Sequence, residues 1–101
     1  LKRLLRKNSK EKIFLTIYNK KIIGLMRIRK HKKRNYLSWV IRKEFRGKNL
    51  GLLMLSTFVK LYRKKYYAFV QKNNIRSIKI CEKAGFSKYR DGSKFNYFVK
   101  K

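Results

Sequence analysis

A glycine-containing loop at residues 45–51 separates two parts of the chain with different side-chain patterns. Residues 36–41 are rich in β-branched and aromatic side chains and predict a strand, whereas apolar residues recur at helical spacing after Gly51. The chain must therefore pass from a strand into a helix at this loop. Because residues 66–70 again predict a strand, the helix is a crossover, and the two strands are expected to be parallel.

The loop also has the composition of a phosphate-binding helix start. A helix N-terminus leaves backbone N–H groups without partners and carries the positive end of the helix dipole. Gly47 and Gly51 permit a phosphate to approach the backbone, while Arg46 and Lys48 add positive charge. An ordinary turn before a surface helix uses similar residues, so the loop alone does not establish phosphate binding.

The segment before the loop predicts a short helix and two further strands. Residues 1–7 place leucines at the spacing of an amphipathic helix. Residues 12–18 and 22–29 are β-branched and aromatic, and the polar turn between them makes them a hairpin. With residues 36–41, three consecutive antiparallel strands are expected.

A second helix and a terminal hairpin complete the predicted order of elements. Asn73 or Asn74 is placed to cap a helix that runs to Lys83, and Gly85 suits the left-handed position after its end. Residues 86–99 then predict two strands joined by a tight turn.

The composition favours one small globular domain over residues 1–101. Apolar residues make up 44% of the 101-residue chain, which is enough for a single core. The 31 Lys and Arg residues and only four carboxylates give a net charge of +27, which favours phosphate-rich small molecules and nucleic acid as partners. Because a lysine-biased composition alone would also spread basic residues through almost every segment, the charge does not choose between these partners.

Nothing in the sequence indicates a metal, a disulfide or a membrane span. Cys81 and His31 are the only residues of their types, so neither an internal disulfide nor a zinc cluster is expected. The apolar runs are too short for a membrane span and the start lacks a signal-peptide pattern, which favours a reducing, cytoplasmic location. Because the chain starts at Leu1, we expect it to be N-terminally truncated.

The loop, combined with a second block at residues 82–86, resembles the GCN5-related N-acetyltransferase (GNAT) superfamily. Arg46, Asn49 and Gly51 fall at the positions of that family's R/Q-x-x-G-x-G/A pyrophosphate loop, where Asn49 departs from the pattern. The resemblance extends over residues 13–99 and implies an α/β (α+β) fold. This fold has a mixed, mostly antiparallel sheet, a central splayed parallel pair and flanking helices, and its first strand is expected to be missing here.

The resemblance implies transfer of an acetyl group from acetyl-coenzyme A to a primary amine. The acceptor would be a small molecule, such as a nucleotide-linked amino sugar, or a macromolecule. In such a fold the pantetheine arm lies in the gap between the splayed strands, and a backbone N–H, here that of Ile41, polarises the thioester carbonyl. The residues implied to bind the coenzyme are Trp39, Val40, Ile41, Arg46, Gly47, Lys48, Asn49, Leu50, Gly51, Asn74 and Ser77.

One face of the predicted second helix carries further candidate residues. Asn74, Ser77 and Cys81 are spaced by three and four and share that face. The resemblance implies that Asn74 bonds the pantetheine amide and that Cys81 stands where a tyrosine often protonates the departing thiolate. Cys81 also fits as a small buried residue. As general base, Glu44 near the cleft mouth is one candidate, and a water relay to backbone carbonyls is the default.

Two other functions stay open on the sequence alone. A basic nucleic-acid-binding module is compatible with the charge of +27 and with Tyr62, Tyr66 and Tyr67, which would stack on bases. A catalytically inactive coenzyme A-binding domain is compatible with the departures at Asn49 and Cys81.

The expected truncation also bears on oligomeric state. Without a preceding strand, residues 12–18 would form an exposed edge that pairs with a second copy, is protected by its lysines or is covered by residues 1–9. We expect a weak, salt-enhanced homodimer through this edge, because screening acts over about 8 Å at physiological salt.

Overall fold

The computed structural model describes residues 2–7 and 10–101, and this part of the chain contains seven strands and two α-helices. In chain order the elements are β1 (Lys2–Lys7), β2 (Glu11–Tyr18), β3 (Lys21–His31), β4 (Arg34–Ile41), the 3-10 turn Lys43–Phe45, α1 (Leu50–Leu61), β5 (Tyr66–Gln71), α2 (Ile75–Lys83), β6 (Ser87–Asp91) and β7 (Phe95–Lys100). Residues 1, 8 and 9, which fall in or next to the predicted N-terminal helix, lie outside the described residues.

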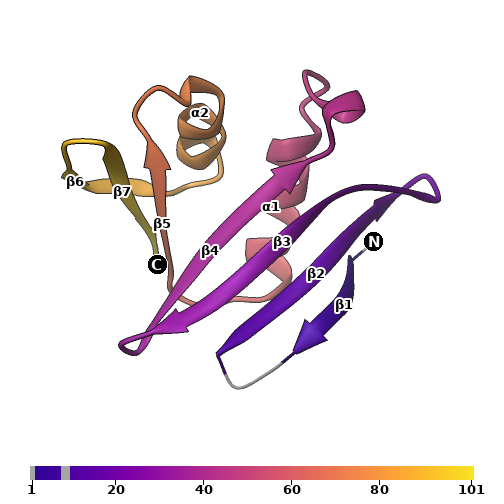
Figure 1. Cartoon of the computed structure of the whole chain (residues 1–101), viewed down its shortest axis with the longest axis horizontal. Helices are drawn as coiled ribbons and strands as arrows, with labels where there is room; N and C mark the ends of the chain where they lie inside the picture. Colours follow the sequence, from indigo (N-terminus) through magenta and orange to yellow (C-terminus); the bar gives the residue numbers. More distant parts are fainter. Residues whose placement is uncertain (1, 8–9) are drawn as a thin grey trace.

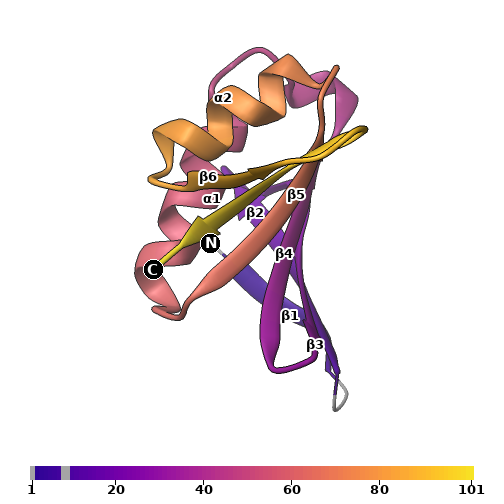
Figure 2. The ribbon, with the colours of Figure 1, turned by 90° about the vertical axis from the view of Figure 1, so that its left-hand side faces the viewer.

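All of these strands belong to one sheet, in the order β1-β2-β3-β4-β5-β7-β6. Every neighbouring pair is antiparallel except β4 and β5, which the α1 crossover makes parallel, as predicted. Figure 1 shows the strands from β1 to β4 on one side of the molecule and those from β5 to β7 on the other. In the turned view of Figure 2, α1 and α2 lie on the same face of the sheet.

The central parallel pair is joined along only part of its length. The paired residues are Asn35 with Tyr66 and Tyr36 with Tyr67, near the start of both strands. Beyond them the two strands diverge, and α2 lies beside the opening in Figure 1. The predicted splay of the central pair is thus confirmed.

Residues 2–7 form a strand and not the predicted helix. β1 runs antiparallel to β2, with Lys2 opposite Thr16. A six-residue segment gains few helical hydrogen bonds on its own, whereas pairing satisfies the backbone groups of two strands at once. β2 is therefore an inner strand. Of the three outcomes expected for the edge at residues 12–18, the structure shows coverage by the preceding segment, here residues 2–7. The homodimer expected through that edge loses its basis.

The helices and the inner face of the sheet enclose one hydrophobic core. Strand alternation buries Tyr66, Ala68 and Val70 of β5 in this core, whereas Tyr67 and Phe69 point to the opposite face. The largest fully buried side chains are Tyr66, Phe58, Phe98, Ile23, Met26, Met54, Leu55 and Cys81. In the described part of the chain, no helix is long and apolar enough to cross a membrane.

Candidate functional site

Three adjoining cavities lie in and beside the gap between β4 and α2. The central one, of about 530 Å³, lies between the end of β4 and the first turns of α2. It shares Arg46 and Arg76 with a cavity of about 200 Å³ at the loop before α1, and Trp39 and Asn74 with one of about 210 Å³ between β4 and β5. Together they form one groove, called the cleft, with a loop end, a centre and a splay end.

The loop before α1 presents backbone N–H groups to the cleft. The first helical bond runs from the N–H of Leu53 to the main-chain oxygen of Asn49 (3.1 Å). The N–H groups of Leu50, Gly51 and Leu52 therefore precede the helical ladder, and the Asn49 side chain makes no capping bond. Leu50, Gly51 and Leu52 all line the loop end of the cleft. Such a set of donors suits an anionic diphosphate.

Asn49 occupies the position of the first glycine in the R/Q-x-x-G-x-G/A pattern. The backbone conformation explains why asparagine is compatible with this position. Asn49 has a φ of +59° and Gly47 a φ of +80°, so both adopt the left-handed conformation. Asparagine tolerates this conformation better than most other non-glycine residues. The departure from the pattern therefore preserves the shape of the loop.

Gly51 lets α1 pass close to both walls of the cleft. A Cβ atom at this position would lie 3.0 Å from Ile80 Cδ1 on α2 and 3.5 Å from Ile41 Cγ1 on β4. Any larger side chain would therefore displace one of the walls or fill the loop end.

Three basic residues of α2 face the loop across the cleft. Arg76, Lys79 and Lys83 follow one another at spacings of three and four, and all line the loop end. The sequence alone gives no signal for these three residues, because lysine and arginine occur in almost every segment. Only the spacing along α2, combined with its position opposite the loop, distinguishes them. With Arg46 they make the loop end strongly cationic.

The two predicted cations of the loop differ in placement. Arg46 lines both the loop end and the centre, and its Nε donates to the main-chain oxygen of Ile41 (3.0 Å). Lys48 lines none of the three cavities, and its Nζ lies 6.0 Å from the ring centroid of Phe45. The structure thus brings Arg46 into the cleft, but not Lys48.

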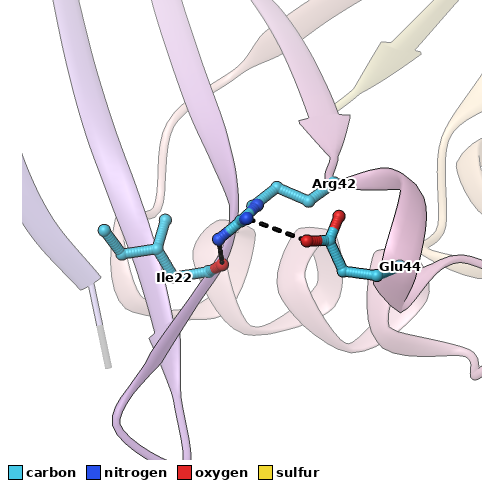
Figure 3. Close-up of polar contacts among 3 residues, drawn as sticks. All are labelled: Ile22, Arg42 and Glu44. Atoms are coloured by element: carbon cyan, nitrogen blue, oxygen red, sulfur yellow. Dashed lines mark hydrogen bonds and ion pairs between the residues drawn. The ribbon is translucent and has the colours of Figure 1, made fainter.

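A further arginine anchors the segment that leads into the loop. Figure 3 shows Arg42 donating from Nη1 to the main-chain oxygen of Ile22 (3.1 Å) and from Nη2 to Glu44 Oε2 (2.8 Å). This contact ties the 3-10 turn after β4 to the start of β3. Glu44 is engaged by Arg42 and lines none of the three cavities, so the structure does not bring this candidate base into the cleft.

No carboxylate lines the cleft among the residues that the structure describes. Glu11 is paired with Arg27 and Asp91 with Lys72, while Glu82 is exposed on α2. The described residues also contain no group of three His, Cys, Asp or Glu side chains that would hold a metal ion. The described lining of the cleft therefore contains neither a carboxylate nor an imidazole.

The unpaired edge of β4 turns main-chain groups of Trp39 and Ile41 toward the cleft. The N–H of Arg42 donates to the main-chain oxygen of Ile23 (2.8 Å) and so points toward β3. Main-chain groups alternate in direction along a strand, so those of Val40 also face β3, while those of Trp39 and Ile41 face the gap. Of the three residues predicted to bind through their main chain, two are thus suitably oriented.

Asn74 and Ser77 lie at the centre of the cleft. Asn74 Oδ1 accepts a hydrogen bond from the N–H of Ser77 (3.2 Å), which makes Asn74 the N-cap of α2, as predicted. Both residues also line the splay end. Because capping uses only the amide oxygen, the amide nitrogen of Asn74 can donate to a ligand.

Cys81 lies in the core and not in the cleft. It is fully buried and lines none of the three cavities. Burial, with a smaller contribution from the charge of Glu82, raises the pKa of its thiol from 9.0 to about 12. This placement fits a small packing residue, and it separates Cys81 from Asn74 and Ser77, with which it was grouped on one helix face.

The buried Cys81 thiol predicts a loss of stability at alkaline pH. The unfolded chain ionises this thiol from about pH 9, while the folded protein holds the proton up to about pH 12, so the free energy of unfolding falls as pH rises through this interval. Tyr66, whose pKa burial raises from 10.0 to about 12, adds to the fall at higher pH. Urea unfolding at a series of pH values measures the slope. Cys81→Ala should make the free energy of unfolding fall less steeply with pH just above pH 9. An equal slope in both proteins would show that the Cys81 thiol does not cause the loss of stability.

The splay end of the cleft opens toward the outer face of the sheet. It is lined by Ser38 and Trp39 of β4, by Phe69 of β5 and by Phe95 of β7. Ser38 and Phe69 are exposed and alternate with inward-facing residues, so they belong to the face away from the helices. The splay end is therefore the part of the cleft that reaches the outer face.

Comparison with known proteins places the chain by sequence pattern and by fold. Residues 1–86 match the Acetyltransferase (GNAT) family. No curated protein sequence matches the chain significantly.

Solved structures of acetyltransferases are similar in fold. The Campylobacter jejuni N-acetyltransferase PseH superposes with a TM-score of 0.80 at 21% identity, over 93% of this chain and 70% of PseH. Its complex with acetyl coenzyme A has a TM-score of 0.77 at 20% identity, with the same coverage. The spermidine/spermine N-acetyltransferase SpeG from Vibrio cholerae gives 0.73 at 17% identity, over 92% of this chain and 68% of SpeG. At these identities the likeness shows a shared fold.

Proposed function

Since the chain belongs to the Acetyltransferase (GNAT) family, we propose that it transfers the acetyl group of acetyl-coenzyme A to a primary amine. The observation that carries this proposal is the early end of β4–β5 pairing, which opens a cleft directly beside the start of α1. One wall offers strand backbone to an extended arm, and one end offers N–H donors to a diphosphate.

The loop end of the cleft fits the charged part of the coenzyme. The diphosphate would accept hydrogen bonds from the N–H groups that precede the α1 ladder, where the left-handed Gly47 and Asn49 shape the loop. Arg46 on one side and the row Arg76, Lys79 and Lys83 on the other would neutralise its charge. Of the predicted phosphate contacts, only that of the Lys48 side chain is left out of this proposal.

The centre of the cleft fits the pantetheine arm and the reacting group. The arm would pair with the main-chain groups of Trp39 and Ile41, while Asn74 would donate from the opposite wall beside Ser77. The coenzyme, when bound, supplies the acetyl group as an activated thioester. The N–H of Ile41 points into the gap and would polarise the thioester carbonyl as a fixed dipole.

Acetyl transfer also requires that the amine loses a proton and that the departing thiolate is neutralised. Because no carboxylate lines the cleft in the described residues, the proton of the amine is proposed to pass to water that main-chain carbonyls hold in place by hydrogen bonds. The departing thiolate would take up a proton from the same water, so that the amine proton ends on the released thiol. Cys81 has no part in either step, because its thiol is buried in the core.

The acceptor is proposed to be an amine on a phosphate-bearing small molecule, such as a nucleotide-linked amino sugar. A chain with a net charge of +27 repels polyamines and attracts phosphates. The acceptor would enter at the splay end, between Phe69 and Trp39. Thiol release from acetyl-coenzyme A with a panel of amines tests this choice, and preference for a polyamine would reject it.

Removing two cations of α2 tests whether these side chains contact the coenzyme, because a matched variant loses the same charge outside the cleft. We expect Lys79→Gln/Lys83→Gln to weaken acetyl-coenzyme A binding about tenfold in calorimetry, because two charge-assisted contacts are lost. Lys60→Gln/Lys64→Gln removes the same charge outside the cleft and should change the affinity by less than about twofold. Equal losses in both variants would show that the α2 row makes no specific contact.

Replacing Asn74 tests whether its amide does more than cap α2. Asn74→Ala loses both the cap and the amide donor, whereas Asn74→Ser keeps an oxygen cap and replaces the amide donor by a shorter hydroxyl that does not reach as far into the cleft. We expect both variants to weaken coenzyme binding about fivefold, and only Asn74→Ala to lower the free energy of unfolding by about 1 kcal/mol. Full affinity in Asn74→Ser would show that the residue acts only as a cap.

Salt dependence and turnover distinguish this function from the two alternatives. Acetyl-coenzyme A binding should persist at moderate salt, whereas a chain that only binds nucleic acid would bind the coenzyme weakly and lose polyanion affinity steeply as salt rises. Coenzyme binding without thiol release for any amine of the panel would indicate the inactive alternative.

A further inference from the structure

The face of the sheet away from the helices carries a cluster of aromatic side chains. Figure 2 shows α1 and α2 on the opposite face and no described element over this one. The cluster, called the aromatic face, takes its rings from β4, β5, β6 and β7: Tyr36, Tyr67, Phe69, Tyr89, Phe95 and Tyr97.

The rings contact one another across all four strands. The ring centroid of Phe69 lies 5.4 Å from that of Phe95 and 6.2 Å from that of Tyr97. Tyr89 extends the cluster onto β6, with its centroid 5.9 Å from that of Tyr67. Phe69 and Tyr89 are nevertheless 53% and 45% exposed. Half-exposed rings held on a rigid sheet provide a platform for flat ligands.

Basic side chains lie over two of these rings. The Arg34 guanidinium carbon is 4.4 Å and the Lys65 Nζ 5.4 Å from the ring centroid of Tyr67. The Arg90 guanidinium carbon is 5.0 Å from the centroid of Tyr97. Each cation is therefore held within a few ångströms of the aromatic surface by cation–π contact.

Negative charge is nearly absent from the strands that build the aromatic face. Their single carboxylate is Asp91, which is paired with Lys72 (2.5 Å). The whole chain carries a net charge of +27. A ligand that combines flat apolar groups with regularly spaced negative charges matches both properties at once.

We propose that the aromatic face binds single-stranded nucleic acid, with bases stacked on the rings and phosphates beside Arg34, Lys65 and Arg90. Four neighbouring strands span about 14 Å at the usual strand spacing, which is room for a few bases. A duplex is a poorer occupant because its bases are already stacked on one another. A second copy of the chain is also poorer, since each copy carries the same large positive charge.

The aromatic face meets the cleft at the splay end, which Phe69 and Phe95 also line, whereas Tyr67 and Tyr89 line no part of the cleft and are therefore the rings chosen for the test. The test therefore uses the full chain without coenzyme. Fluorescence anisotropy measures binding of a labelled, mixed-sequence single-stranded oligonucleotide, of the matching duplex and of inorganic polyphosphate at one salt concentration. Tyr67→Leu/Tyr89→Leu removes two rings without changing the charge. Tyr62→Leu removes a partly exposed ring on the other side of the sheet and serves as the control.

We expect Tyr67→Leu/Tyr89→Leu to weaken oligonucleotide binding about tenfold or more and to leave polyphosphate binding unchanged, with the control like the unaltered protein. If the double variant does not fold, Arg34→Gln/Arg90→Gln keeps the rings and should lower the salt slope by about 1.4, the value for two phosphate contacts to a single strand. Unchanged oligonucleotide binding, equal losses for oligonucleotide and polyphosphate, tighter binding of the duplex, or a dimer that the ring variant abolishes would each overturn the proposal.

Discussion

Replacing Gly51 with valine is expected to weaken acetyl-coenzyme A binding by more than tenfold, which is more than about 1.4 kcal/mol. A Cβ atom at Gly51 already approaches Ile80 to 3.0 Å and Ile41 to 3.5 Å. The two further methyl groups of valine must enter the loop end of the cleft or push α2 away. Either change keeps a diphosphate from the N–H groups at the start of α1.

Calorimetric titration measures this effect, with Gly51→Ala as the matched control. Alanine adds only the Cβ, which meets the movable end of the Ile80 side chain, and it favours the helix over glycine by up to about 1 kcal/mol. We therefore expect Gly51→Ala to bind more tightly than Gly51→Val. A folded Gly51→Val protein with unchanged affinity would remove the loop from the coenzyme site.

Gly24→Ala is expected to lower the free energy of unfolding by about 2–4 kcal/mol. A Cβ atom at Gly24 would lie 2.2 Å from the main-chain oxygen of Val40 and 3.1 Å from Ile41 Cα, both in the paired strand β4. This oxygen is part of the backbone and cannot rotate away as the end of a side chain does. β3 and β4 must therefore separate locally, next to the cleft.

Urea unfolding of Gly24→Ala and Gly51→Ala gives the comparison, because both changes add a single methyl group. The first meets backbone and the second a side-chain end, so only Gly24→Ala should be strongly destabilised. Its coenzyme affinity should fall as well, since Ile41 belongs to the displaced part of β4. Similar unfolding free energies for the two variants would show that the contact at Gly24 is easily relieved.

Features with local signals could be predicted from the sequence. The capping role of Asn74 and the left-handed Gly85, with a φ of +97°, each depend on a few adjacent residues. The splay of the central strands is different. It was expected from the family resemblance, because no local pattern shows that pairing stops at Tyr36 and Tyr67.

Features set by packing between distant segments could not be predicted. Residues 1–7 carry leucines at a spacing that suits a short helix, and only the pairing with β2 makes residues 2–7 a strand. The hypothesis that Tyr62, Tyr66 and Tyr67 together would stack on bases failed for a similar reason. Tyr66 is buried and donates to the main-chain oxygen of Tyr62 (2.6 Å), Tyr62 packs against Phe58, and only Tyr67 reaches the aromatic face.

The short pairing of β4 with β5 also leaves the sheet as two strand units with little pairing between them, over one shared core. The strands β1–β4 form one unit and β5–β7 the other, and two residue pairs are their only strand pairing in the described chain. Local unfolding at this junction would show as faster amide hydrogen exchange in Tyr66 and Tyr67 than in the centre of either unit. A ligand held between β4 and α2 would contact elements on both sides of this junction, so we expect it to slow the exchange of Tyr66 and Tyr67.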